Sequence, residues 1–145
     1  MSLHITSTTK SVKRLRPKTS KELKTIIVQE IKRQGPDVDL NFIDTSEITD
    51  MSRLFLLSGI RNIKIDLWDV SNVENMSEMF HGCGYFTADL SNWDVSKVKY
   101  MGYMFCNCHS FNSDLSGWDV SNVTRYAGTF AECYNITTDM QPKFQ

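Results

Sequence analysis

The chain has 145 residues, of which 41% are hydrophobic and 11% aromatic, so its composition is that of one globular domain and excludes a disordered chain. Its formal net charge of −1 excludes a global electrostatic attraction to nucleic acid or to an acidic membrane surface. No apolar run approaches the ~18 residues of a membrane span, and the first ten residues lack the apolar core of an export signal. We therefore expect no membrane span, and a cytoplasmic location for the chain as written.

Residues 1–18 are the first predicted segment, a flexible basic arm. They contain five basic residues and no acidic residue: Lys10, Lys13, Arg14, Arg16 and Lys18. A short charged terminus of this kind is typical of a solvated leader. The alternative is a contact with nucleic acid or with an acidic partner, since clustered positive charge attracts phosphate and carboxylate groups.

Residues 19–36 predict an N-terminal capping helix. Thr19 and Glu22 have the spacing of a capping box, and Gly35-Pro36 ends the helical pattern after residue 34. Between them the apolar residues recur at helical intervals: Leu23, Ile26, Ile27 and Ile31. Such a helix would cover the first of a series of stacked repeats, which has no predecessor to cover it.

Residues 37–140 repeat the pattern Asp-Leu-Ser-x-Trp-Asp-Val-Ser-x-Val-x-x-Met-x-x-Met-Phe every 25 residues. One tryptophan, one phenylalanine and one cysteine mark each unit: Trp68, Trp93 and Trp118; Phe80, Phe105 and Phe130; Cys83, Cys108 and Cys133. A fixed period of this length indicates units that bury their apolar faces only by stacking on their neighbours. We expect about four coils, at residues 40–64, 65–89, 90–114 and 115–140.

Each coil is predicted to contain one short strand and one short helix. The inward strand residues would be Ile65, Leu90, Leu115 and Met140. The helix N-caps would be Ser71, Ser96 and Ser121, and in the second coil one apolar helix face would comprise Val73, Met76, Met79 and Phe80. The predicted fold is therefore an α/β solenoid of about four coils with an N-terminal capping helix.

The last coil departs from the pattern, because Tyr126 and Thr129 replace methionines, and residues 141–145 form a short C-terminal tail. Terminal repeats are usually atypical, so we expect this coil to close the stack. The alternative is an open edge that pairs with another chain, which predicts weak homo-association through the C-terminal edge.

The tandem motif resembles the BspA-like leucine-rich-repeat family of bacteria. The copies that carry the resemblance are residues 68–73, 93–98 and 118–123, each Trp-Asp-Val-Ser-x-Val, and the resemblance covers about residues 37–140. It implies a short right-handed leucine-rich-repeat superhelix without enzyme activity. In secreted members it also implies a surface protein that binds host or neighbouring-cell proteins, and hence a cell-surface or secreted location.

Two ladders of side chains are predicted to be structural: Trp68, Trp93 and Trp118, and Cys83, Cys108 and Cys133. Large aromatic residues fill the corners of a narrow coil, although a stacking platform for sugars or bases is the alternative for the tryptophans. A free cysteine behaves as a small hydrophobe. A zinc site among the cysteines and histidines of residues 81–109 is an alternative, but Cys-x-Cys-His is not the spacing of a standard zinc finger.

Three sets of polar or aromatic residues are candidates for binding. An outward acidic stripe would comprise Asp89, Asp114 and Asp139, with local hydrogen bonding as the alternative. Asp69, Asp94 and Asp119 are predicted to accept local backbone N–H groups in Asx turns, with calcium binding as the alternative. Tyr100 and Tyr103 replace polar residues of the preceding coil, and exposed aromatic residues are typical of interface hot spots.

The sequence therefore predicts a non-enzymatic module that binds a protein partner through a rigid repeat surface, with no catalytic residue, cofactor or metal. Repeats produce ladders of identical side chains, whereas a catalytic site needs different residues that converge on one point. The alternatives are nucleic-acid or acidic-partner binding through the basic arm, and a zinc or thiol site.

Overall fold

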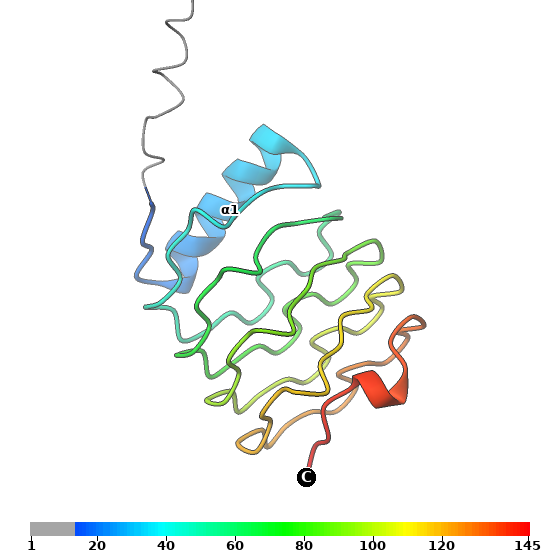
Figure 1. The fold of residues 1–145 in the computed structure, drawn as a ribbon. Coiled ribbons are helices and arrows are strands. Elements are labelled where there is room, and N and C mark those ends of the chain that lie inside the picture. The colour runs from blue at the N-terminus through cyan, green and yellow to red at the C-terminus, as the bar shows by residue number, and fades with distance from the viewer. Residues whose placement is uncertain (1–13) are drawn as a thin grey trace, which may run out of the picture.

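Helix α1, Ser20–Gln34, is the first element of the computed structural model, which describes residues 14–145 (Figure 1). The Thr19 hydroxyl oxygen accepts the N–H of Glu22 at 3.1 Å, and the Glu22 carboxylate accepts the N–H of Lys18 at 2.8 Å. Gly35, with a φ of 90°, ends the helix and donates its N–H to the Ile31 carbonyl at 2.8 Å. The predicted helix is confirmed, and Glu22 reaches one residue further back than a capping box requires.

The buried face of α1 covers the N-terminal end of the repeats (Figure 1). Leu23 and Ile27 are 0% and 1% exposed. The Ser20 hydroxyl donates to the Asp50 carbonyl, and Lys24 Nζ donates to the Arg53 carbonyl at 3.1 Å. Apolar and polar contacts therefore both hold α1 on the first repeat.

Residues 14–18 are the described part of the predicted basic arm. Leu15 forms a parallel bridge with Ile43, and its carbonyl accepts the N–H of Asp44 at 2.7 Å. Arg16 Nε lies 3.6 Å from the Asp44 carboxylate, and Pro17 is buried. The remaining residues of the arm, 1–13, lie outside the described residues, so the predicted contact with nucleic acid stays a prediction.

The predicted strand and helix in each repeat are wrong, and the α/β solenoid of leucine-rich-repeat type is wrong with them. Beyond α1, residues 14–145 contain one further helix, the 3-10 helix η2 (Thr138–Met140). They contain no β-sheet, since the parallel pairing is confined to isolated bridges such as that of Asn75 with Tyr100. The rest of the repeats consists of turns and irregular backbone.

Left-handed residues explain why no short helix forms. Two positions in each repeat have a φ between 55° and 77°, namely Arg53, Glu78, Tyr103 and Gly128 at the first and Leu57, Gly82, Asn107 and Glu132 at the second. A left-handed residue cannot continue a right-handed helix, so the chain turns at each of these positions. The Met-x-x-Met-Phe segment is therefore a pair of turns, and Ser71, Ser96 and Ser121 are not helix N-caps.

Backbone hydrogen bonds join the equivalent segments of successive repeats, which lie side by side in Figure 1. Every second N–H of the Met-x-x-Met-Phe segment donates to a carbonyl 24 residues later, as Met76 does to Tyr100 at 2.8 Å. The intervening N–H groups donate three residues back, as Met79 does to Met76 at 3.2 Å. The inter-repeat donors are Met51, Arg53, Phe55 and Leu57; Met76, Glu78, Phe80 and Gly82; Met101, Tyr103, Phe105 and Asn107.

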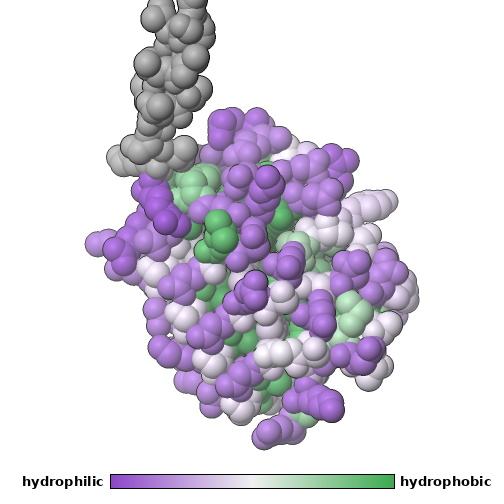
Figure 2. Space-filling model, viewed as in Figure 1, coloured by the Kyte–Doolittle hydropathy of each residue, from purple (hydrophilic) through white to green (hydrophobic). Residues whose placement is uncertain are grey.

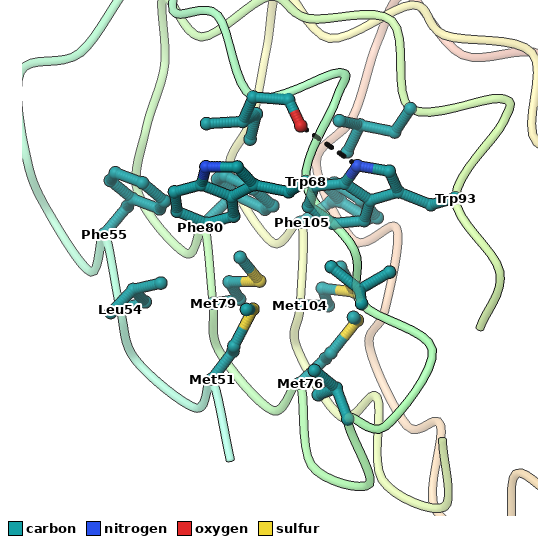
Figure 3. Packing of buried hydrophobic residues seen from close by; sticks show 14 of the residues in the cluster. Met51, Leu54, Phe55, Trp68, Met76, Met79, Phe80, Trp93, Met104 and Phe105 are labelled. Carbon is teal, nitrogen blue, oxygen red and sulfur yellow. Dashed lines mark hydrogen bonds between the residues drawn. The ribbon is translucent and has the colours of Figure 1, made fainter. Parts of the chain in front are cut away.

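A column of phenylalanine rings runs through the core. The rings of Phe55, Phe80, Phe105 and Phe130 follow one another at centroid distances of 5.3, 5.5 and 5.6 Å and within 9° of parallel. Figure 3 shows the first three of them beside the buried methionines of the same segments. The 25-residue period therefore places one phenylalanine ring of each repeat in a single stacked column.

The three tryptophans occupy equivalent places in successive repeats. Trp68, Trp93 and Trp118 are 4–5% exposed. Each indole N–H donates to a main-chain carbonyl 28 residues earlier, at 2.9, 3.1 and 2.9 Å; the acceptors are Leu40, Ile65 and Leu90. Figure 3 shows this bond for Trp93. Burial leaves no indole face free to serve as a stacking platform.

We expect Leu57→Gly to raise the free energy of unfolding by about 1 kcal/mol. Leu57 has a φ of 55°, and its side chain is 72% exposed, so glycine relieves the left-handed conformation with little loss of burial. Leu67→Gly is the matched control, because Leu67 is 69% exposed and its φ is not positive. Urea denaturation of both variants is the measurement. The control should lose about 0.5–1 kcal/mol, and a similar loss in Leu57→Gly would contradict the prediction.

Candidate interaction surface

A surface groove of about 680 Å³ lies on the outer side of the Met-x-x-Met-Phe segments. Side chains from three successive repeats line it. We call it the tyrosine groove, formed by Ser77, Glu78, Gly102, Tyr103, Thr124, Arg125, Tyr126 and Ala127. The lining therefore combines two aromatic rings, one acidic and one basic side chain, and small residues. This combination suits recognition of another protein surface better than catalysis.

Tyr103 is held in place while about half of its surface stays exposed. Its ring lies across Gly128, where a Cβ atom would come within 2.4 Å of Tyr103 Cε1. Gly128 also has a left-handed φ of 65°, so it provides both the conformation and the space. The His81 ring stacks on Tyr103 at 6.5 Å, and Tyr103 is 48% exposed. The predicted contact residue therefore presents a fixed aromatic surface.

Tyr126 is the second aromatic residue of the groove. It is 39% exposed, its ring stacks on Phe144 at 4.5 Å, and its hydroxyl donates to the Gln145 carbonyl at 3.4 Å. Sequence reasoning treated Tyr126 only as a departure from methionine and missed it. The signal was its position in the last repeat of residues 14–145, where tyrosine replaces the methionine that is buried in the preceding repeat.

Tyr100 lies beside the groove, not in its lining. It is half-buried, and the Arg125 guanidinium lies 5.4 Å from its ring centroid in a cation–π contact. Tyr100 thereby positions Arg125 at the rim. At the other rim the Glu78 carboxylate accepts a hydrogen bond from Arg53 Nε at 3.2 Å and lies 3.4 Å from His81 Nδ1.

The aspartates next to the tryptophans form Asx turns. Each carboxylate accepts the N–H of the serine two residues later at 2.9–3.0 Å and the hydroxyl of the same serine at 2.6 Å; the pairs are Asp69–Ser71, Asp94–Ser96 and Asp119–Ser121. These local bonds account for the recurrence of Asp-x-Ser in successive repeats.

The predicted acidic stripe is only partly brought together. Asp89 and Asp114 line one shallow groove of about 490 Å³, and each accepts the N–H of the serine two residues later at 3.0 Å. Asp139 lies in η2, accepts the Thr137 hydroxyl at 2.5 Å and lines a different groove beside Lys143. A binding role for these residues stays a prediction.

Acid is expected to destabilise the protein through the Asx turns. Hydrogen bonds from the serine hydroxyls, and then from the backbone N–H groups, lower the pKa of the Asp94 and Asp119 carboxyls. A pKa lowered by folding contributes stability above the unfolded value of about 3.9, and that stability is lost as the pH falls through the folded value. We expect the Tm, measured by circular dichroism between pH 7 and pH 2, to decrease once the pH is below about 4. The double variant Asp94→Asn/Asp119→Asn keeps a side-chain acceptor oxygen at each position but cannot be protonated, so its Tm should decrease less at low pH. The same dependence of Tm on pH in wild type and variant would contradict the role of these two carboxylates.

Two buried thiols and one half-buried thiol form a ladder along the repeats. The sulfurs of Cys83, Cys108 and Cys133 donate to the carbonyls of residues 28 positions earlier at 3.0, 2.9 and 2.8 Å. Burial raises the pKa of the Cys83 and Cys133 thiols to about 11, and raises the pKa of Cys108 further. All four cysteines are free. Within residues 14–145, no three His, Cys, Asp or Glu side chains are placed to hold a metal ion together.

Neither helix in the described part of the chain has the length and hydrophobicity that a membrane span requires. Residues 24–143 match the family described as "Mycoplasma protein of unknown function, DUF285". No curated protein and no solved structure matches the chain. The family match covers most of α1, all of the repeats and most of the C-terminal tail.

Proposed function

The chain belongs to the DUF285 family, described as Mycoplasma protein of unknown function, and we propose that it is a non-enzymatic module that binds a protein partner through the tyrosine groove. The observation that carries the proposal is the fixed, half-exposed ring of Tyr103 against Gly128. Exposed aromatic residues held in place supply most of the binding energy at protein interfaces.

The surroundings of Tyr103 support the same role. Tyr126 supplies a second ring, while Glu78 and Arg125 place one negative and one positive charge at the rim. An aromatic centre with a charged rim is the usual composition of a protein interface. Because Tyr103 is restrained before binding, little conformational entropy is lost when a partner covers it.

Hydrophilic residues cover much of the face drawn in Figure 2. Other exposed aromatic residues, such as Tyr85 at 75% and Tyr134 at 69%, lie outside the groove lining. They provide matched controls, since they test whether any exposed tyrosine suffices.

The experiment compares wild type, Tyr103→Ala and Tyr85→Ala as immobilised full chains. A photo-crosslinking residue at Ala127, inside the groove, captures the partner from cells that express the protein, and the affinity for the purified partner is then measured by titration. We expect Tyr103→Ala to weaken binding at least about tenfold and Tyr85→Ala to leave it unchanged. Equal affinities for wild type and Tyr103→Ala, with both variants folded by circular dichroism, would refute the role of the groove.

A further inference from the structure

Along the Met-x-x-Met-Phe segments, the hydrogen bonds between repeats form a ladder that runs in one direction. At each of its three junctions along the Met-x-x-Met-Phe segments, the N–H groups belong to the earlier repeat and the carbonyl groups to the later one. In the last repeat the equivalent donors are the backbone N–H groups of Tyr126, Gly128, Phe130 and Glu132. We call this row the donor edge, and none of its N–H groups has an acceptor within residues 14–145. Unpaired main-chain donors in a row are a template for another chain.

The apolar core is also unfinished at the donor edge. Phe130 stacks on Phe105 at 5.6 Å, yet Phe130 is half-buried where Phe105 is 0% exposed. Tyr126 is 39% exposed where Met101, one period earlier, is 0% exposed. The last repeat therefore lacks both the hydrogen bonds and the apolar contacts that a following repeat supplies at every earlier junction.

The C-terminal tail covers only part of this end. The Met140 carbonyl accepts the N–H of Leu115 at 2.7 Å, and Phe144 stacks on Tyr126 at 4.5 Å. None of the main-chain bonds of the tail reaches the donor edge. The tail thus closes the side of the tryptophan turns and leaves the ladder itself uncapped.

A second copy of this chain does not fit the donor edge. The complementary carbonyl end of the first repeat is covered by α1, through the buried Leu23 and Ile27 and the Ser20 bond to Asp50. Two donor edges facing each other would place N–H groups opposite N–H groups. The polarity of the ladder therefore argues against the homo-association that the decayed final repeat suggests.

We propose that the donor edge is a docking site for a Met-x-x-Met-Phe-like segment of a partner protein. The carbonyl groups of that segment accept the four N–H groups, and its aromatic residue extends the phenylalanine column beyond Phe130. The occupant follows from continuity, because the same interface occurs three times inside the chain. The binding mode is the addition of one row to an exposed main-chain edge.

The test uses ¹⁵N-labelled full chain and a synthetic peptide with the sequence of residues 74–86, which carries the acceptor carbonyls of the second repeat. Without peptide, the four donor-edge amides should exchange with solvent at least about 100-fold faster than the amides of Met101, Tyr103, Phe105 and Asn107. Millimolar peptide should slow the exchange of the four donor-edge amides by about tenfold. The same peptide with Phe80→Ala should leave the exchange rates of these amides unchanged.

Three results would overturn the proposal. Slow exchange of the four amides in the free protein would show that the edge is already paired. Unchanged exchange at millimolar peptide would show that the edge does not accept the segment. Concentration-dependent association of the full chain in sedimentation, accompanied by protection of these amides, would assign the edge to a second copy instead of a partner.

Discussion

Phe105→Ala is expected to lower the free energy of unfolding by about 3–5 kcal/mol. Phe105 is 0% exposed and lies between Phe80 and Phe130 at centroid distances of 5.5 and 5.6 Å. It also stacks on Phe111 at 4.3 Å. The truncation therefore opens a cavity in the middle of the aromatic column, and the loss is a large share of the about 5–15 kcal/mol that stabilises an ordinary domain.

Phe130→Ala is the matched control for this prediction. Phe130 is half-buried and has Phe105 as its only neighbour in the column within the described chain. We expect Phe130→Ala to lower the free energy of unfolding by about half as much as Phe105→Ala, because less surface is buried and no internal cavity remains. Chemical denaturation followed by circular dichroism measures both variants. Equal losses would show that the column is not stabilised by contacts on both sides of each ring.

Trp93→Ala should cost a similar amount, about 3–5 kcal/mol, through two separable effects. The indole is 4% exposed, and its N–H donates to the buried main chain at Ile65 at 3.1 Å. Alanine removes the ring volume and one of the two donors to the Ile65 carbonyl, which also accepts the N–H of Trp68 at 3.1 Å. The loss of this one hydrogen bond accounts for about 0.5–1.5 kcal/mol of the total.

Trp93→Phe separates the two effects, since phenylalanine keeps an aromatic ring but cannot donate a hydrogen bond. Its stability should lie between those of wild type and Trp93→Ala. Tyr85→Phe removes a hydroxyl from a residue that is 75% exposed and should change the stability by less than about 0.5 kcal/mol. A Trp93→Phe variant as stable as wild type would mean that the indole hydrogen bond to Ile65 adds nothing to the bond that the backbone N–H of Trp68 already makes to the same carbonyl.

The repeat register and the buried residues could be predicted from the period, but the conformation of the repeats could not. Val73, Met76, Met79 and Phe80 are all 0% exposed, as their apolar pattern predicts. The same spacing fits a segment that turns twice, and the turns depend on left-handed residues. Glycine marks only some of these positions, since Arg53 and Leu57 adopt the same φ with ordinary side chains. The sequence signal for a turn was therefore weaker than the signal for an amphipathic helix.

The predicted strands fail for a related reason. Leu90 points inward with 0% exposure, as expected, but its N–H donates to the Ser113 hydroxyl at 3.0 Å and not to a backbone carbonyl. This side-chain acceptor interrupts the main-chain pairing in the third repeat, while the equivalent N–H groups of the first and last repeats donate to backbone carbonyls at 3.0 and 2.7 Å. The pairing on this side therefore stays limited to single bonds and isolated bridges. Of the candidate interaction site, Tyr103 was predicted, whereas Tyr126 was missed because its exposure depends on how far the C-terminal tail covers it.

The ladder of cysteine sulfurs determines which thiol reacts most readily with an added reagent. A thiol reacts as the thiolate, and the raised pKa values of Cys83, Cys108 and Cys133 keep these sulfurs protonated at neutral pH. Cys106 lies outside the ladder and is half-buried; partial burial and two nearby glutamates raise the pKa of its thiol as well, but its sulfur makes no hydrogen bond to a carbonyl within residues 14–145. We therefore expect a maleimide dye offered briefly to the native protein to attach first at Cys106, the least buried of the four thiols. The wild-type chain thus has a single-site handle for fluorescence without any change to its sequence.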